Sequence, residues 1–311
     1  MDARPKCNLI IDSCCDLPYE VVDREGVWLL EFPYIDEKGD HCDDFYRSIT
    51  SHEFYEGMRA GSQPSTAQVP ITKFQEVFGQ AIESGVPTVY LSFTRGLSGS
   101  YDTALMVRDQ IVEEHPGFEL YVVETCLASI AEGLLVYEAL RERSRGLTAS
   151  QMVEWANEAK FFINEMFMVD DLEALRRGGR IPASVALAGA KLDVKPMLDI
   201  ALDGKLSLVG VARGRKKGIK QLAEFYKKRI EHVSDERRRV IIGHSDCPKD
   251  VERLKDELRK LDETIVFLET SIGPVIGSHV GPGMLALAFW GVDSREMLSI
   301  SERIASRVHR D

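Results

Sequence analysis

The sequence predicts an α/β protein with two domains. With 311 residues, the chain is long enough for two cores, because domains usually contain about 100–200 residues. In its first half, short apolar runs alternate with helical stretches, a pattern typical of a mostly parallel sheet flanked by helices. In its second half, a segment that alternates apolar and polar residues around Asp203-Gly204 predicts a β-hairpin within another α/β domain. We place the boundary near residue 165, which gives domains of residues 1–165 and 166–311.

The strands of the first domain are predicted at short, continuous apolar runs, which are typical of buried strands. Asp16 has the position of a helix N-cap with Pro18 in the first turn, and Thr50 and Glu53 have the spacing of a capping box. Thr148 is the expected N-cap of the last helix. The predicted strands are 7–11, 27–32, 88–93 and 119–124, and the predicted helices are 16–25, 50–60, 70–84, 99–114, 128–145 and 149–163.

The second domain combines the hairpin with further helices and strands. The hairpin covers residues 192–210, and strands are predicted at 239–244 and 264–269. A long loop, 271–283, follows the last of these strands. The predicted helices of this domain are 217–232, 248–261 and 294–308.

Composition disfavours several classes of protein. The chain has 39 basic and 50 acidic residues, and its net charge of −11 disfavours a general binder of nucleic acid or of an anionic membrane, because both carry negative charge. None of the 6 cysteines forms a CxxC pair, so we expect free thiols in a reducing compartment. No signal segment opens the chain and no apolar run approaches the ~20 residues of a membrane span. We therefore expect a soluble, cytoplasmic protein without stable membrane insertion.

Hydroxyl-bearing and small residues occupy the loops where ligands are expected. In a parallel sheet, ligands bind where strands end and the next loops begin, and the loops 12–16, 94–99 and 124–129 meet that description. The segment GSQPST (61–66) adds hydroxyl donors at Ser62, Ser65 and Thr66. Such segments also have a purely structural interpretation, as loops that cap the helices after them.

One histidine lies in a stiff frame of glycine and proline. His279 is surrounded by six such residues in the eleven positions 273–283, which indicates a tightly specified backbone path. A histidine held in this way can bind a carboxylate or take part in acid–base chemistry, although a structural role would explain it as well.

Basic residues gather in two short segments of this acidic chain. One contains Arg176, Arg177 and Arg180, and the other covers 213–217. Both suit phosphate or an acidic partner surface, or else form a solvated face. The sequence has no GxxxxGK[ST], GxGxxG after the first strand, HExxH, GxSxG or metal-ligand spacing. We therefore expect neither a metal nor a cofactor.

Seven short motifs occur in order over about residues 8–290, and together they resemble the DegV family. The better-understood members of this family are the fatty-acid-binding subunits of bacterial fatty acid kinase. Each motif is short, but their joint occurrence in order is highly specific. The motifs are DSCCDLP (12–18), GSQPS (61–65), LSGSY (97–101), VDDLEALRRGGRI (169–181), KPML (195–198), RGRKKG (213–218) and IGPVIGSHVGPG (272–283).

The resemblance implies that a long-chain fatty acid lies in a cleft between the two domains. It also implies that the protein is not itself an enzyme but presents the fatty acid carboxylate to a separate ATP-binding kinase subunit, which forms acyl phosphate. The residues that it assigns to the carboxylate are Ser62, Thr94 or Ser98, and His279. The residues that it assigns to kinase docking or phosphate contact are Arg176, Arg177 and Arg180.

The sequence departs from the family pattern at four places, of which two keep a hydroxyl group: Ser100 and Ser278 stand where the family usually has threonine. Gly61 stands where the family usually has threonine, and Thr94-Arg95 replaces a pair of serines. If Arg95 faces the cleft, it would pair with the carboxylate or narrow the chain-length preference. The small residues at 183–190 are expected to leave room for the lipid tail.

Two other functions stay open at this stage. A self-contained phosphotransfer or hydrolytic enzyme would use Ser98 or Thr94 as nucleophile and His279 as base. A nucleotide- or phosphate-sensing module would use the two basic segments instead.

Overall fold

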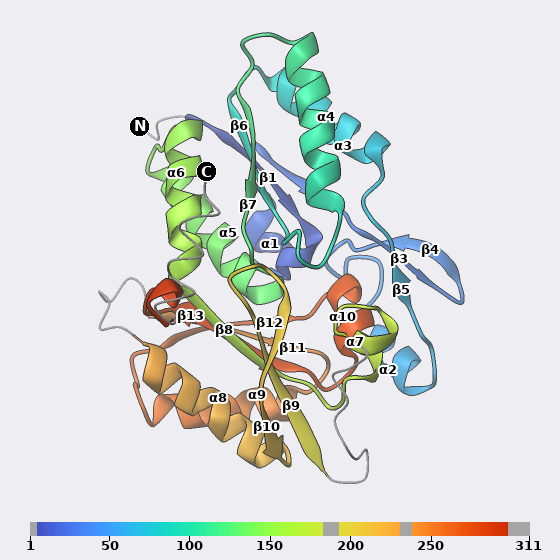
Figure 1. Ribbon diagram of the computed structural model, residues 1–311, viewed down its shortest axis with the longest axis vertical. Helices are drawn as coiled ribbons and strands as arrows, with labels where there is room; N and C mark the ends of the chain where they lie inside the picture. The colour runs from blue at the N-terminus through green and yellow to red at the C-terminus, as the bar shows by residue number, and fades with distance from the viewer. Residues whose placement is uncertain (1–4, 183–192, 231–237, 298–311) are drawn as a thin grey trace.

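The computed structural model describes residues 5–182, 193–230 and 238–297 (Figure 1). It confirms the predicted α/β class. Within these ranges the chain forms a parallel four-stranded sheet, a mixed six-stranded sheet and a small three-stranded sheet. No helix among these residues is long and apolar enough to cross a membrane.

The parallel sheet has the strand order β2-β1-β6-β7, and helices cover both of its faces. Because both faces are covered, all residues of β1 and β6 are buried. α3 and α4 pack on one face, and α5 and α6 pack on the other (Figure 1). The bounds are β1 Asn8–Asp12, β2 Val27–Leu30, β6 Thr88–Ser92, β7 Leu120–Glu124, α3 Ile71–Ser84, α4 Ser100–Glu114, α5 Ser129–Ser144 and α6 Ala149–Ala159.

The six-stranded sheet has the order β10-β9-β8-β13-β11-β12, in which only β11 and β12 pair in parallel. The hairpin expected around Asp203-Gly204 is confirmed as β9 and β10. α8 and α9 cover one face of this sheet. The bounds are β8 Ile163–Met168, β9 Val194–Ile200, β10 Leu206–Arg213, β11 Arg239–His244, β12 Val266–Ser271, β13 Leu285–Trp290, α8 Arg215–Arg229 and α9 Pro248–Arg259.

Helix α5 joins the two large sheets. It packs on the parallel sheet and also contacts β8, β11 and β13 of the mixed sheet, so one apolar core runs through both. This position explains why so much of α5 is buried, including the charged side chains Glu132, Glu138 and Arg143. The two halves of the chain are therefore held together by a shared core around one helix.

A small sheet of β4, β3 and β5 lies beside the loop that carries His279. That loop contains a short helix, α10 (Pro274–Val280), which contacts β3, β5, α2 and α7. The sequence predicted only a loop here, and β3 and β4 were not predicted. The bounds are β3 Pro33–Asp36, β4 Gly39–Cys42, β5 Ser65–Thr66, α2 Ser51–Arg59 and α7 Glu173–Arg177.

Local capping signals agree with the structure at some helices and not at others. The capping boxes at Thr50 and Thr148 are both formed. The prediction for the first helix was wrong: Asp16 is not a helix N-cap but lies in the left-handed region (φ 49°), and α1 covers only Tyr19–Val22. The carboxylate of Asp16 instead accepts hydrogen bonds from distant parts of the chain, as described below. Two predicted features lie outside the described residues: the small residues at 183–190 and the part of the last predicted helix at 298–308.

Candidate functional site

A cavity lies between the parallel sheet and the six-stranded sheet. The space between its walls, together with the solvent at its opening, amounts to about 710 Å³. Residues from both halves of the chain line it, and most of them are apolar. The apolar wall includes Phe93, Phe167, Val275, Val280, Met284 and Ala286. We call this space the central cavity.

Thr66 and His279 form the polar end of the central cavity. β5 pairs with β3 so that Thr66 lies opposite Tyr34, and this register brings the Thr66 hydroxyl to 2.8 Å from Nε2 of His279. Gly178 closes the other side of the imidazole, because a Cβ atom there would lie 2.1 Å from Nδ1 of His279. The ring is thus fixed between a hydroxyl group and the backbone of the α7 end.

The imidazole of His279 is neutral at pH 7 in this structure. Burial, together with the nearby positive charges of Arg180 and Arg177, lowers its pKa to about 4. Its Nδ1 atom is buried and has no hydrogen-bond partner among the described residues. Because Gly178 covers this atom, a carboxylate that enters the cavity would meet the other side of the ring, where Nε2 contacts Thr66.

Ser98 and Arg180 complete the polar end of the cavity wall. The Ser98 hydroxyl donates to Oγ of Ser100 over 3.0 Å and accepts the backbone N–H of Ser100. Arg180 donates from Nε to the backbone oxygen of Leu97 over 3.2 Å, which fixes its guanidinium beside the same loop. The cavity thereby offers two hydroxyl groups, an imidazole and one cation at a single end.

Two residues expected at the carboxylate are engaged elsewhere. The hydroxyl of Ser62 donates to Oε2 of Glu37 over 2.6 Å, and Ser62 does not line the central cavity. The buried Thr94 donates to the backbone oxygen of Gly204 over 3.0 Å, which ties the β9–β10 turn to the loop after β6. The structure therefore brings Ser98 and His279 together, but not Ser62 or Thr94. Of the hydroxyl groups in the segment 61–66, it is that of Thr66 that lies beside His279.

The arginines of the predicted docking segment have two different environments. Arg176 and Arg177 are exposed on α7, and Arg176 pairs with Glu173 over 2.9 Å. Arg180 is half-buried in the wall of the central cavity instead. Arg95 points to solvent, where it pairs with Asp102 over 3.1 Å, so it does not narrow the cavity.

Buried carboxyl groups anchor the start of the helix that carries His279. The backbone N–H of Gly273 donates to Oδ1 of Asp16 over 2.8 Å, and Ser129 donates to the other oxygen of Asp16. A Cβ atom at Gly273 would lie 2.6 Å from Asp43, so this approach requires glycine. The loop after β1 thereby fixes the N-terminal end of α10.

These carboxyl groups make the stability of the protein depend on pH. Burial raises the pKa of Asp12 to about 6 and that of Asp16 to about 7, so the native state holds protons that the unfolded chain has already lost. The contribution of these two groups to the free energy of unfolding is therefore greatest below the unfolded pKa of about 4 and falls as pH rises to about 7. His279 acts in the opposite sense, but only below its unfolded pKa of about 6.5, because its pKa is lowered.

We expect the thermal midpoint to fall by several degrees between about pH 6.5 and pH 8, where His279 no longer contributes. The conservative variant Asp16→Asn should show a smaller fall, because one of the titrating groups is gone. Calorimetry of both proteins over this range checks the prediction. A midpoint that rises with pH in the parent protein would contradict it.

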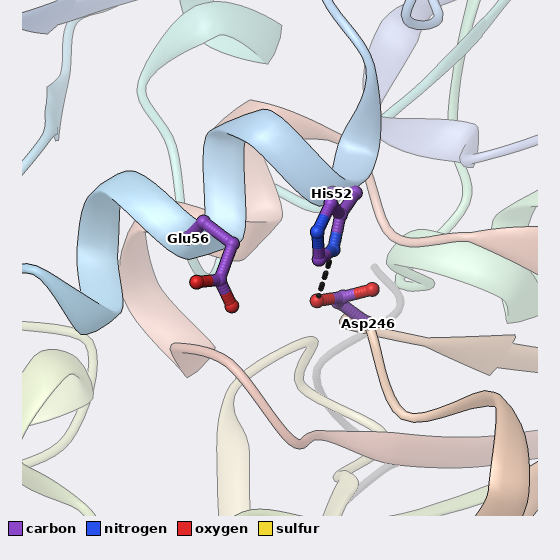
Figure 2. A group of neighbouring side chains, drawn as sticks. All are labelled: His52, Glu56 and Asp246. Atoms are coloured by element: carbon purple, nitrogen blue, oxygen red, sulfur yellow. Dashed lines mark hydrogen bonds and ion pairs between the residues drawn. The ribbon is translucent and has the colours of Figure 1, made fainter.

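Three side chains on the surface have the spacing of metal ligands but are already paired with an arginine. Ligand atoms of His52, Glu56 and Asp246 lie within 4.8 Å of one another (Figure 2). Nη1 of Arg59 forms ion pairs with both Glu56 and Asp246. Because the guanidinium already neutralises the two carboxylates, this group is better explained as a contact between α2 and the loop after β11 than as a metal site.

Comparisons with known proteins give relatives over most of the length of this chain. The DegV family model, described as an uncharacterised protein, matches residues 6–291. The DegV domain-containing protein CPE0026 of Clostridium perfringens is 35% identical over 291 residues, which cover 94% of this chain and 99% of that protein. The fatty acid binding DegV family protein SAG1342 of Streptococcus agalactiae has a crystal structure with TM-score 0.80 and 26% identity, covering 92% of this chain and 99% of its own. A DegV family protein from Thermus thermophilus, solved to show fatty acid binding, has TM-score 0.78 and 26% identity, covering 92% and 100%.

Proposed function

This chain belongs to the DegV family, and on that premise we propose that it binds a long-chain fatty acid in the central cavity. The observation that carries the proposal is the division of the cavity into a mostly apolar wall and a group of polar side chains around His279. A fatty acid has the same division, with an apolar tail and a carboxylate. The residues that we assign to the carboxylate are Thr66, Ser98, Arg180 and His279.

Favourable binding of a fatty acid requires both the apolar wall and the polar side chains of the cavity. Burial of a 16-carbon tail is worth roughly 12 kcal/mol at about 0.8 kcal/mol per methylene. Association and ordering cost about 4–15 kcal/mol, so the tail alone leaves little affinity. A buried carboxylate without donors would remove several kcal/mol more. The hydroxyl groups, the imidazole and the guanidinium at the polar end satisfy the carboxylate and make net binding favourable.

Organic extraction of the purified protein, followed by mass spectrometry, tests this function. We expect about one long-chain fatty acid per chain, and the distribution of chain lengths reports the length of the cavity. Protein treated to remove lipid should bind an added long-chain acid again. Protein that carries no lipid and binds no added acid would contradict the proposal.

We further propose that the bound carboxylate is presented to a separate ATP-dependent kinase subunit for acyl-phosphate formation. This step is supported by the resemblance of the chain to fatty-acid-binding kinase subunits. It is also supported by the exposed positive charges of Arg176 and Arg177 on α7, whose last turn leads directly to Gly178 against His279. A partner that docks on α7 would therefore lie next to the polar end of the cavity.

Reversal of both exposed charges, Arg176→Glu with Arg177→Glu, separates docking from lipid binding. We expect acyl-phosphate formation with a fatty acid kinase subunit to fall about tenfold or more, because two attractive charges become repulsive. Fatty acid affinity should change less than about threefold, since neither side chain lines the cavity. Isotope transfer from labelled ATP measures the first quantity, and ligand displacement measures the second. Loss of lipid binding with unchanged turnover would reverse the assignment.

The geometry does not favour a self-contained enzyme. Ser98 donates to Ser100 and Thr94 donates to Gly204, so neither hydroxyl is paired with His279. The hydroxyl that does contact the imidazole is that of Thr66, and no carboxylate orients Nδ1 of His279 among the described residues. In the second basic segment, Arg215 already pairs with Asp170 and Asp250. This pairing counts against a phosphate-sensing module.

A further inference from the structure

The wall of the central cavity carries a carboxyl group far from the polar end described above. Glu165 lies on β8, two residues from Phe167 and on the same face of the sheet. β8 pairs with β13, where Phe167 lies opposite Ala286 and Glu165 lies opposite Ala288. The loop that carries His279 leads through Met284 into β13. Ala288, the residue of β13 that pairs with Glu165, lies four residues beyond Met284, or roughly 13 Å along the strand.

Glu165 has hydrogen-bonding capacity that the protein does not use. Its Oε1 atom is buried and has no hydrogen-bond partner among the described residues. Burial raises the pKa of this carboxyl group well above its usual range, and the neighbouring Asp199 acts in the same direction. Burial therefore favours the protonated form, which can donate one hydrogen bond and accept another. A buried polar group without a hydrogen-bond partner lowers the stability of the protein.

A second, polar cavity begins at Glu165. It amounts to about 850 Å³, counted with the solvent at its opening, and shares the side chains of Glu165 and Ile200 with the central cavity. Its wall also contains Asn164, Asp199 and Arg229, where Nη1 of Arg229 donates to Asn164 over 3.2 Å. A fatty acid tail that extends along β13 would therefore reach polar side chains and not a closed apolar wall.

We propose that the preferred ligand is a hydroxylated long-chain fatty acid, and that Glu165 binds the hydroxyl group on its tail. The inference rests on the proposed function, because it concerns the tail of the same ligand. A hydroxyl group can accept the proton of the neutral carboxyl group and donate to its other oxygen. A second carboxylate at this place would lie beside Asp199, whose like charge opposes the attraction of Arg229. A plain methyl-terminated chain would leave Glu165 buried without a partner.

Competition binding tests the inference. A fluorescent long-chain fatty acid is displaced by hexadecanoic acid, by hexadecanoic acids hydroxylated at the terminal or at a mid-chain carbon, and by hexadecanedioic acid. In the parent protein, at least one hydroxy acid should bind about tenfold more tightly than hexadecanoic acid, as expected for one hydrogen bond in a dry site. Glu165→Gln should keep most of this preference, because the amide also donates and accepts. Glu165→Leu should lose it and bind hexadecanoic acid more tightly.

The outcomes separate this inference from the proposed function. If neither plain nor hydroxylated acids displace the probe, the proposed function fails. If all acids bind equally, or if Glu165→Leu keeps the preference for a hydroxy acid, only the role of Glu165 fails. Tighter binding of hexadecanedioic acid than of any hydroxy acid would likewise overturn it. Melting curves of both variants show that they fold, and removal of the unpaired carboxyl group should raise the midpoint of Glu165→Leu.

Discussion

Fatty acid binding should fall about ten- to a hundredfold in His279→Ala. The imidazole holds the Thr66 hydroxyl at 2.8 Å, and when Nε2 donates to that oxygen the hydroxyl proton is free to face the carboxylate. Loss of the ring therefore releases the Thr66 hydroxyl group from the orientation in which it donates to the carboxylate. Hydrogen bonds to a charged group are worth about 1.5–3 kcal/mol, which corresponds to this range of affinity. Displacement of a fluorescent fatty acid measures the change.

Two matched variants show whether this loss is specific. Ser62→Ala should keep the parent affinity within about twofold, because the Ser62 hydroxyl is engaged with Glu37 outside the cavity. His279→Gln should recover part of the affinity, since its amide can occupy the position of Nε2 beside Thr66. Parent affinity in His279→Ala, or an equal loss in Ser62→Ala, would show that the carboxylate binds elsewhere.

The contrast between Ser62 and Thr66 shows what the sequence could and could not predict. The segment GSQPST offers three hydroxyl groups within five residues, and the motif alone gives no reason to prefer one. The choice is made by the pairing of β5 with β3, which the sequence did not reveal because β5 has only two residues. Long, continuous apolar runs such as β1 and β6 were predictable, because burial on both faces leaves a clear pattern.

The sequence did not reveal the buried positions of Asp16 and Glu165, for a related reason. Asp16 directly before a proline-containing turn has the local pattern of a helix cap, but its conformation is set by contacts with Ser129 and Gly273, which are distant in sequence. Glu165 is a charged residue inside an otherwise mostly apolar strand, which is a signal that sequence reasoning could have used. Buried polar groups of this kind are specified by tertiary contacts, so local rules fail there first.

Long-chain binding should fall about a hundredfold in Ala286→Phe, while the protein without ligand stays as stable as the parent or becomes more stable. Ala286 lines the central cavity and lies on β13 two residues before Ala288, which pairs with Glu165. Only 3% of the surface of Ala286 is exposed. A phenyl ring there would occupy the space of about four methylenes, worth about 3 kcal/mol at ~0.8 kcal/mol each. Ring atoms that fill an apolar void also gain contacts in the ligand-free protein.

The neighbouring alanine provides the control for this variant. Ala288 lies on the same face of β13 and is fully buried in the apolar core, but it does not line the central cavity. Ala288→Phe should therefore lower the melting temperature, because its ring has no void to fill. Short fatty acids should still bind Ala286→Phe, since the polar end remains intact. If a long-chain acid binds Ala286→Phe with parent affinity, the tail does not run along β13, because the ring and the tail cannot share that space.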